Sequence, residues 1–292
     1  MYGVGEHMIL VTGATGKVGR NVVEELREAG VAVRALAREP AAAEFDARAG
    51  VDVEVMRGDL TDPRSLVPAL RGVDAVFLLW PFLTTKAAPP VLEVIGEHTR
   101  RIVYLSSQGV RDDGAVQADP INAFHAEMER LIERSGLERT VLRPTGFASN
   151  ALGWAEQIRE RDVVRQPFGD LARPLIHERD IAAVAARALA QPGHRGRTYV
   201  LTGPRSLTTR EQTDAIAEAI GRPLAFEEMP MEEARASMLA QGLPAEVADG
   251  MLAAHAEMMR SPEPVNRKVE ELTGAPARTF REWAADHADE FR

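Results

Sequence analysis

The sequence predicts an α/β fold, with a doubly wound parallel sheet and a smaller, mostly helical C-terminal lobe. Two observations support this fold class. Short apolar runs alternate with helical patterns through the first half of the 292 residues, and a glycine-rich turn joins the first run to the first helix. Strands separated by helices pair in parallel, because parallel neighbours need a crossover connection.

The predicted strands of the sheet are short and apolar, and they cover residues 8–12, 31–37, 51–56, 75–79, 102–105 and 140–142. The helical patterns between them cover residues 17–29, 63–70, 90–99 and 121–135. Gly30 follows the first of these helices, at a position where glycine commonly ends a helix. Helical patterns therefore fill four of the five connections between these six strands; none is predicted between residues 37 and 51.

The second half of the sequence is less regular and more helical. Its helical patterns cover residues 150–158, 180–190, 208–220, 231–259 and about 279–291, and one further strand covers 198–201. We expect one domain over residues 1–150 and a second over 151–292, with about 178–203 packing back on the sheet. Methionines at this spacing usually fill a core, and the 231–259 helix carries Met231, Met238, Met251, Met258 and Met259.

Composition and charge exclude several classes of function. The 35 basic residues are outnumbered by 44 acidic ones, which argues against direct nucleic-acid binding. The absence of cysteine excludes disulfides and thiolate chemistry, and the histidines show no metal-ligand spacing. No apolar run approaches the roughly 20 residues of a membrane helix, and residues 1–7 do not resemble a signal peptide. We therefore expect a cytoplasmic protein without a metal, membrane or nucleic-acid partner.

The glycine-rich turn is the most informative segment, and residues 11–20 read VTGATGKVGR. Its three glycines follow a strand and open a helix, which is the context expected of a dinucleotide-binding turn. The first glycine permits the tight turn, the second lets a pyrophosphate approach the backbone, and the third allows close helix packing. The amino end of the helix then favours the phosphate charge. The predicted cofactor-binding residues of this turn are Gly13, Ala14, Thr15, Gly16, Lys17, Val18 and Gly19.

The residue after the second strand indicates which dinucleotide is preferred. Arg38 stands there, and an arginine suits the 2′-phosphate of NADP(H). The neighbouring Glu39 leaves NAD(H) as an alternative, since a carboxylate at this place binds the ribose of NAD. Asp59 and Leu60 follow the third strand and are predicted to meet the adenine, with turn capping as the equal alternative for Asp59.

These residues together resemble the NmrA-like, atypical branch of the short-chain dehydrogenase/reductase superfamily, whose members have an NAD(P)-binding Rossmann domain. The resemblance covers most of the chain, in the right order. It is carried by TGATGKVG (12–19), RALAR (34–38), GDL (58–60), YLSS (104–107), SGL (135–137), LRPTGF (142–147), HERDIA (177–182) and LTGP (201–204). The family's activities are diverse, so the resemblance implies a specific fold and cofactor but no specific reaction.

The resemblance also implies which segments border the nicotinamide and the substrate. Residues that follow the fourth, fifth and sixth strands would touch the nicotinamide end: Leu79, Trp80, Ser106, Pro144 and Phe147. The family's substrate cleft lies between the cofactor sheet and the C-terminal lobe. An apolar pocket for a planar substrate is predicted there, with ordinary core as the alternative; its candidate residues are Phe82, Phe124, Asn150 and Trp154.

The sequence departs from the superfamily in one respect that bears on mechanism. Most members use a Tyr-x-x-x-Lys pair to transfer a proton, yet none of the three tyrosines has a lysine four residues later. Aligning helix 121–135 places Ile121 at the tyrosine position and His125 at the lysine position. The candidate catalytic residues are His125, Ser107 and Gln108, because histidine serves as a proton donor near neutral pH. A histidine that only orients the cofactor or lies on the helix surface is the alternative.

We expect an NADP(H)-dependent oxidoreductase that reduces a small planar or carbonyl acceptor, such as a quinone, by hydride transfer. The cofactor supplies the chemistry, and a quinone spreads the resulting negative charge, so a strong acid is less necessary. Two alternatives remain open. One is a non-catalytic NADP-sensing protein that acts through a protein partner, and the other is a pathway-specific biosynthetic reductase or isomerase.

Overall fold

A seven-stranded sheet forms the centre of the computed structural model, which describes residues 7–42, 45, 52–113, 116–117 and 119–292. The strand order is β3-β2-β1-β4-β5-β6-β8, and β1 to β6 pair in parallel. The predicted α/β class is therefore confirmed. The strands are β1 (Met8–Val11), β2 (Ala32–Ala37), β3 (Val53–Arg57), β4 (Ala75–Leu78), β5 (Arg101–Leu105), β6 (Glu138–Pro144) and β8 (Thr198–Leu201).

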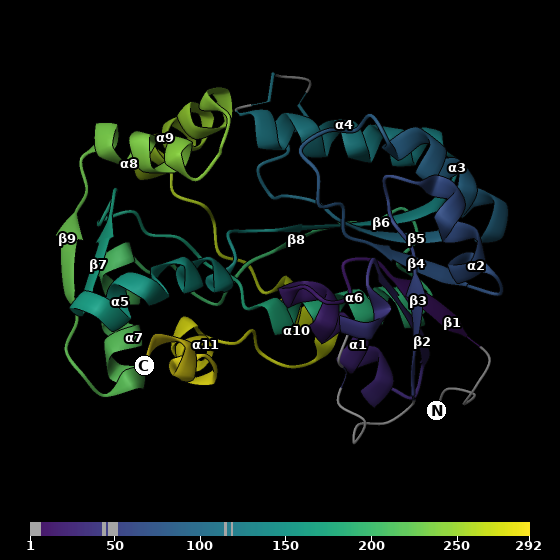
Figure 1. The fold of residues 1–292 in the computed structure, drawn as a ribbon, viewed down its shortest axis with the longest axis horizontal. Helices are drawn as coiled ribbons and strands as arrows, with labels where there is room; N and C mark the ends of the chain where they lie inside the picture. Colours follow the sequence, from purple (N-terminus) through teal and green to yellow (C-terminus); the bar gives the residue numbers. More distant parts are fainter. Residues whose placement is uncertain (1–6, 43–44, 46–51, 114–115, 118) are drawn as a thin grey trace. The chain divides into compact units, whose positions relative to one another are not determined.

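Helices cover both faces of this sheet (Figure 1). Helices α1 (Lys17–Glu28) and α6 (Glu178–Ala190) pack together on one face. Helices α2 (Val67–Leu70), α3 (Ala88–His98) and α4 (Pro120–Arg134) cover the other face. A sheet covered on both faces buries successive residues of a strand alike, which explains the continuous apolar runs of the sequence.

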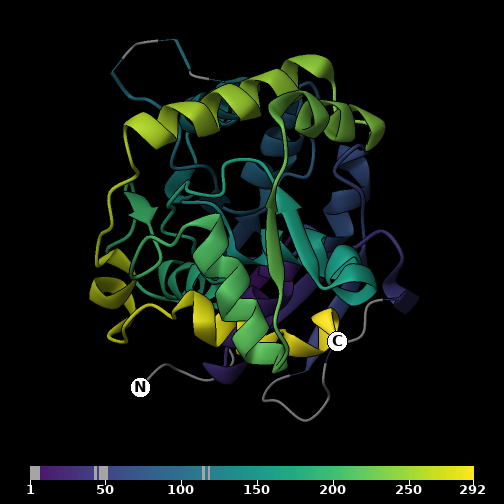
Figure 2. The ribbon, with the colours of Figure 1, turned by 90° about the vertical axis from the view of Figure 1, so that its left-hand side faces the viewer.

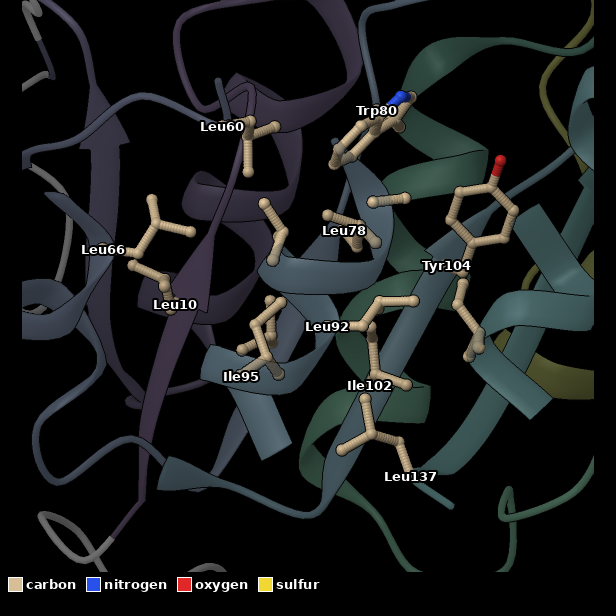
Figure 3. Packing of buried hydrophobic residues seen from close by; sticks show 14 of the residues in the cluster. Leu10, Leu60, Leu66, Leu78, Trp80, Leu92, Ile95, Ile102, Tyr104 and Leu137 are labelled. Carbon is tan, nitrogen blue, oxygen red and sulfur yellow. The ribbon is translucent and has the colours of Figure 1, made fainter. Parts of the chain in front are cut away.

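The core between the sheet and α3–α4 is closely packed (Figure 3). Alternate residues of the strands point into it, since successive side chains of a strand face opposite sides. Leu10 of β1, Leu78 of β4 and Ile102 of β5 meet Leu92 and Ile95 of α3 there, and all five are buried. This apolar layer holds α3 against the sheet.

The site follows from the order in which the strands pair. β1 pairs with β2 on one side and with β4 on the other, so the chain crosses the sheet in opposite directions from this point. In open α/β sheets ligands bind beyond the carboxyl ends of the strands at such a reversal. The segments that leave the carboxyl ends are residues 12–16, 38–39, 58–60, 79–82 and 106–109.

The chain groups into two compact units. The first comprises the described parts of Met1–Val110, Phe124–Pro144 and Glu178–Val200; the second comprises those of Arg111–Ala123, Thr145–His177 and Leu201–Arg292. The second unit contains a two-stranded parallel sheet, and Figure 2 shows its strands β7 (Val163–Gln166) and β9 (Ala225–Glu228) side by side. Its helices are α5 (Ala155–Arg161), α7 (Thr209–Ile220), α8 (Met231–Ala240), α9 (Ala245–Arg260), α10 (Lys268–Thr273) and α11 (Phe280–Asp286).

Two expectations for the second unit were wrong or incomplete. The single helix predicted over 231–259 is two helices, because Gly242 takes a left-handed backbone conformation (φ +87°) after α8 and Pro244 precedes α9. The methionines of this segment do not fill a core: Met231 and Met259 are exposed, and the other three are half-buried. Strands β7 and β9 were not predicted, since each has only four residues, two of them polar.

Across the described residues, no helix combines the length and the hydropathy that crossing a bilayer requires.

Two glycines inside helices of the first unit lead to opposite predictions. A Cβ atom on Gly19 of α1 would lie 2.1 Å from the carbonyl oxygen of Gly13, whereas a Cβ on Gly96 of α3 would meet only Leu137, at 3.9 Å. We expect Gly19→Ala to lower the free energy of unfolding by about 1–3 kcal/mol through overpacking. Gly96→Ala should raise it by up to about 1 kcal/mol, because alanine favours a helix.

Urea unfolding followed by circular dichroism measures both changes. Equal unfolding midpoints for Gly19→Ala and the unchanged protein would contradict this prediction, because the turn after β1 would then accommodate the added methyl group without a loss of stability.

Candidate functional site

The turn after β1 is built around two glycines that no other residue can replace without strain. Gly13 has a left-handed backbone (φ +61°), and a Cβ there would lie 3.1 Å from Leu79 Cδ2. The turn closes when Gly16 N–H donates to the Gly13 carbonyl oxygen at 2.9 Å. Gly19 packs its backbone against the same carbonyl, so α1 starts directly beside the turn. The result is a tight strand–turn–helix connection whose backbone approaches both α1 and Leu79 closely.

The amino end of α1 is suited to an anion. Gly16 occupies the N-cap and has no side chain to cap the helix, and the first turn carries Lys17 and Arg20 but no acidic residue. The first amides of a helix lack intrahelical partners and lie at the positive end of its dipole, where phosphate groups bind. Thr15, Gly16 and Lys17 are exposed, so an anion can approach this backbone. These features fit the pyrophosphate of a dinucleotide.

The turn is fastened to the neighbouring strand by Thr12. The Thr12 hydroxyl accepts a hydrogen bond from Leu79 N–H at 2.9 Å and donates one to the Leu79 carbonyl oxygen at 3.0 Å. Leu79 therefore lies beside the glycine turn, and its contact with the cofactor stays a prediction. Trp80 is buried in the core. Its Nε1–H donates to the Thr84 carbonyl oxygen at 3.0 Å, and the centroid of its ring lies 5.4 Å from that of the Phe82 ring.

Arg38 and the glycine turn line one groove. A hollow of about 360 Å³ is bordered by Thr15 of the turn and by Ala37, Arg38 and Glu39 at the end of β2. The exposed guanidinium of Arg38 thus lies in the same depression as the turn predicted to hold the pyrophosphate. This arrangement is the one that a 2′-phosphate next to a ribose requires.

Asp59 holds the turn that follows β3. Its Oδ1 accepts hydrogen bonds from the amide and the hydroxyl of Thr61, both at 2.8 Å. These bonds, together with the charge of Arg38, hold the pKa of the Asp59 carboxyl below its usual value. The turn-capping role is therefore seen directly, whereas the adenine contact stays a prediction. Leu60 is buried beside it.

The loop after β5 is braced by β6. Ser106 N–H donates to the Leu142 carbonyl oxygen at 2.7 Å, and Gln108 N–H donates to the Pro144 carbonyl oxygen at 3.0 Å. The Ser107 hydroxyl accepts from Gly109 N–H at 3.2 Å. Ser107 and Gln108 are half-buried at the carboxyl edge of the sheet, next to the strand that carries Leu79. Their catalytic role stays a prediction.

His125 is paired with a tyrosine from the sheet. The Tyr104 hydroxyl and His125 Nδ1 are 2.8 Å apart, so β5 and α4 meet at a hydrogen bond. Tyr104 is 0% exposed. Burial raises the pKa of Tyr104, and the negative charge of Glu129 raises it further, so the phenol keeps its proton. Phe124 is buried in the core, and the centroid of its ring lies 4.8 Å from the centroid of the His125 imidazole.

One helical turn beyond His125, Glu129 joins the same helix to two strands. The Ser106 hydroxyl donates to Glu129 Oε1, and Arg143 of β6 donates from Nε and Nη2 at 2.9 and 2.6 Å. The side chains of Arg143 and Glu129 are only 7% and 13% exposed. Sequence reasoning missed this pair and the hydrogen bond between Tyr104 and His125. The i, i+4 spacing of His125 and Glu129 was the available signal, because it places both on one face of α4.

The predicted residues beyond β6 belong to the second unit. Ala148 N–H bonds the Ile176 carbonyl oxygen at 2.9 Å, which starts a 3-10 turn over Ala148–Trp154. Phe147 and Trp154 are half-buried at the two ends of this turn, and Asn150 is exposed within it. The pocket that these residues were expected to share with Phe82 and Phe124 stays a prediction. In the part of the chain that the structure describes, no three histidine or carboxylate side chains gather as a metal site.

Comparisons with known proteins agree with this geometry. A family model described as NAD(P)H-binding matches residues 13–192. A (4-alkanoyl-5-oxo-2,5-dihydrofuran-3-yl)methyl phosphate reductase of Streptomyces griseus is 42% identical over 97% of this chain and 99% of its own. An NAD(P)H azoreductase of Xenophilus azovorans is 36% identical, with the same two coverages. The NADPH complex of an Escherichia coli quinone oxidoreductase superposes with a TM-score of 0.78 at 25% identity, over 96% of this chain and 99% of that one.

The buried ion pair on α4 yields a stability prediction. Glu129→Ala leaves the Arg143 charge buried without its partner, so we expect the free energy of unfolding to fall by about 3–5 kcal/mol. Glu270→Ala is the matched control, because Arg267 and Glu270 form the same two-bonded pair at 2.9 and 2.8 Å with side chains 78% and 37% exposed.

The control variant should lose no more than about 1 kcal/mol, as exposed pairs do. Urea unfolding of both variants measures these losses of unfolding free energy. Similar losses in the two variants would mean that the Glu129–Arg143 pair contributes no more than an exposed ion pair.

Proposed function

This chain belongs to the NAD(P)H-binding family, and we propose that it is an NADP(H)-dependent oxidoreductase that reduces a small conjugated acceptor. The observation that carries the proposal is the continuous site from the glycine turn to Arg38. Gly19 has no room for a Cβ beside the Gly13 carbonyl, and the groove bordered by Thr15 also contains Arg38. Both features fit a dinucleotide that carries a 2′-phosphate.

The names of the relatives support a conjugated acceptor. They are reductases of an azo group, a quinone and an unsaturated lactone whose ring double bond is conjugated to carbonyl groups. In each of these groups, the negative charge left by a hydride spreads over several atoms. Such an acceptor needs a weaker acid than an isolated ketone does, which accords with a sequence that has no Tyr-x-x-x-Lys pair.

The chain's own residues bind, orient and donate hydrogen bonds. Bound NADPH supplies the hydride, and a proton from water completes the two-electron reduction of the acceptor. The amides of the glycine turn hold the pyrophosphate, Arg38 binds the 2′-phosphate, and Leu79 packs beside the cofactor. The loop of Ser107 and Gln108, braced on β6, orients the acceptor with their hydroxyl and amide groups. His125 donates a hydrogen bond where negative charge develops.

The proposal predicts a pattern of acceptors. NADPH oxidation, followed at the absorbance of the reduced nicotinamide, is measured with 1,4-naphthoquinone, an azo dye, an α,β-unsaturated lactone and cyclohexanone. We expect turnover with at least one conjugated acceptor and none with cyclohexanone, because the ketone concentrates charge on one oxygen.

Equal rates with cyclohexanone would overturn the preference for conjugated acceptors. Tight NADPH binding without reduction of any acceptor would instead favour an NADP-sensing protein. Turnover confined to the lactone would favour a biosynthetic reductase.

Arg38 provides a separate prediction about the cofactor. Arg38→Ala removes the charge-assisted bonds to a 2′-phosphate, each worth about 1.5–3 kcal/mol, so the Kd for NADPH should rise roughly 10- to 100-fold. The Kd for NADH, which has no 2′-phosphate, should stay within about twofold. Isothermal titration calorimetry measures both values.

Arg71→Ala is the control, since Arg71 is an equally exposed arginine that precedes β4, at the opposite edge of the sheet. Parallel losses for NADPH and NADH in Arg38→Ala would remove the role assigned to this residue.

A further inference from the structure

We propose that Tyr104 is a positioning residue that sets which ring nitrogen of His125 carries the proton. In this arrangement Tyr104 donates its hydroxyl proton to Nδ1, so that Nε2–H is the group His125 offers to the acceptor. The inference rests on the proposed function, because it concerns the same site. It adds a residue that sequence reasoning did not connect with the reaction.

The direction of the hydrogen bond follows from the surroundings of Tyr104. Its hydroxyl lies 2.8 Å from His125 Nδ1, and this is its one hydrogen bond within the described part of the chain. The side chain is fully buried, and the phenol keeps its proton. If Nδ1–H were the donor, the buried O–H of Tyr104 would have no acceptor, which is costly in a low-dielectric interior. The hydroxyl therefore donates, and a neutral His125 carries its proton on Nε2.

Two contacts prevent the imidazole from leaving this position. Tyr104 lies in β5, and Ser106 follows this strand directly; the side chains of both reach α4, on the same face of the sheet. Tyr104 holds His125, and Ser106 holds Glu129 one helical turn later, with Arg143 as a second partner of Glu129. Figure 3 shows the Tyr104 hydroxyl directed toward the end of the sheet where Trp80 lies, which is the carboxyl edge.

A neutral Nε2–H donor suits a conjugated acceptor. Negative charge develops on the acceptor as it receives the hydride, and the Nε2–H group stabilises this charge by a hydrogen bond. The imidazole keeps its proton, and water supplies the proton that completes the reduced product. His125 thus returns to the same protonation state after each turnover.

A double-mutant cycle tests whether Tyr104 acts through His125. The variants are Tyr104→Phe, His125→Ala and both together, assayed with NADPH and 1,4-naphthoquinone. We expect Tyr104→Phe to lower kcat about tenfold, with the KM for NADPH unchanged, and to cause no further loss in the His125→Ala background. Additive losses would overturn the proposal, because Tyr104 would then act independently of His125.

Tyr199→Phe is the matched control. The chain contains a second tyrosine–histidine pair, in which the Tyr199 hydroxyl lies 2.9 Å from His194 Nδ1. His194 lies at the opposite edge of the sheet, where its carbonyl oxygen accepts from Thr140 near the start of β6. Removing this hydroxyl deletes the same kind of bond away from the site, so kcat should not change. An equal loss in Tyr199→Phe would attribute the effect to stability.

Nitrogen-15 NMR of histidine-labelled protein provides a readout that does not depend on activity. The signals of His125 are assigned by their absence in His125→Ala. In the unchanged protein at pH 8, we expect Nδ1 to be unprotonated and hydrogen-bonded and Nε2 to carry the proton. Tyr104→Phe should move the Nδ1 signal, while Tyr199→Phe should move only that of His194.

A proton found on Nδ1 of His125 in the unchanged protein overturns the proposal even if Tyr104→Phe does not fold. The absence of any reductase activity would instead contradict the proposed function, and the NMR result would still decide the tautomer.

Discussion

The pairing of β1 with β2 on one side and with β4 on the other determines where every predicted binding residue of the first unit lies. In a parallel sheet the carboxyl ends of all strands lie at one edge. Where the strand order reverses, the loops on the two sides of that point run apart and leave a crevice. The glycine turn after β1 therefore lies between the end of β2, with Arg38, and the end of β4, with Leu79. Thr12 completes this arrangement, because both of its hydroxyl hydrogen bonds go to the backbone of Leu79.

The same face of the sheet combines an apolar layer with polar contacts near its carboxyl edge. Away from that edge, Ile102 of β5 packs with Leu92 and Ile95 of α3 in an apolar cluster. At the edge, Tyr104 and Ser106 meet α4 through hydrogen bonds, and Arg143 pairs with Glu129. A buried ion pair gains little net stability over apolar packing, since both charges lose water. The pair links α4 to β6 through directional hydrogen bonds, in addition to the apolar contacts of the same helix.

Local features of the site were predictable, and contacts between distant residues were not. The glycine turn was recognised because strand, turn and helix are consecutive, and Arg38 because it ends the next strand. The partner of His125 is 21 residues away, and finding it requires the rotation of α4 relative to β5. Strands β7 and β9 pair across about 60 residues with only four residues each, too few for a periodicity. The break at Gly242 was present in the sequence, but the helical pattern on both sides concealed it.

The tyrosine–histidine pair offers a physical reason for a histidine at position 125, where the resemblance to the superfamily implies a lysine. A lysine on this face of α4 would place an ammonium charge beside the ring of Phe124 and the buried phenol of Tyr104. Glu129, the carboxylate one turn later, is already engaged by Arg143 and Ser106, so an ammonium at this half-buried position would have to direct its charge toward water. A neutral imidazole needs no counter-charge, and the hydrogen bond with Tyr104 helps to orient it. A donor without charge is also sufficient for an acceptor that spreads its negative charge over several atoms, so the site and the proposed substrate class have the same physical requirement.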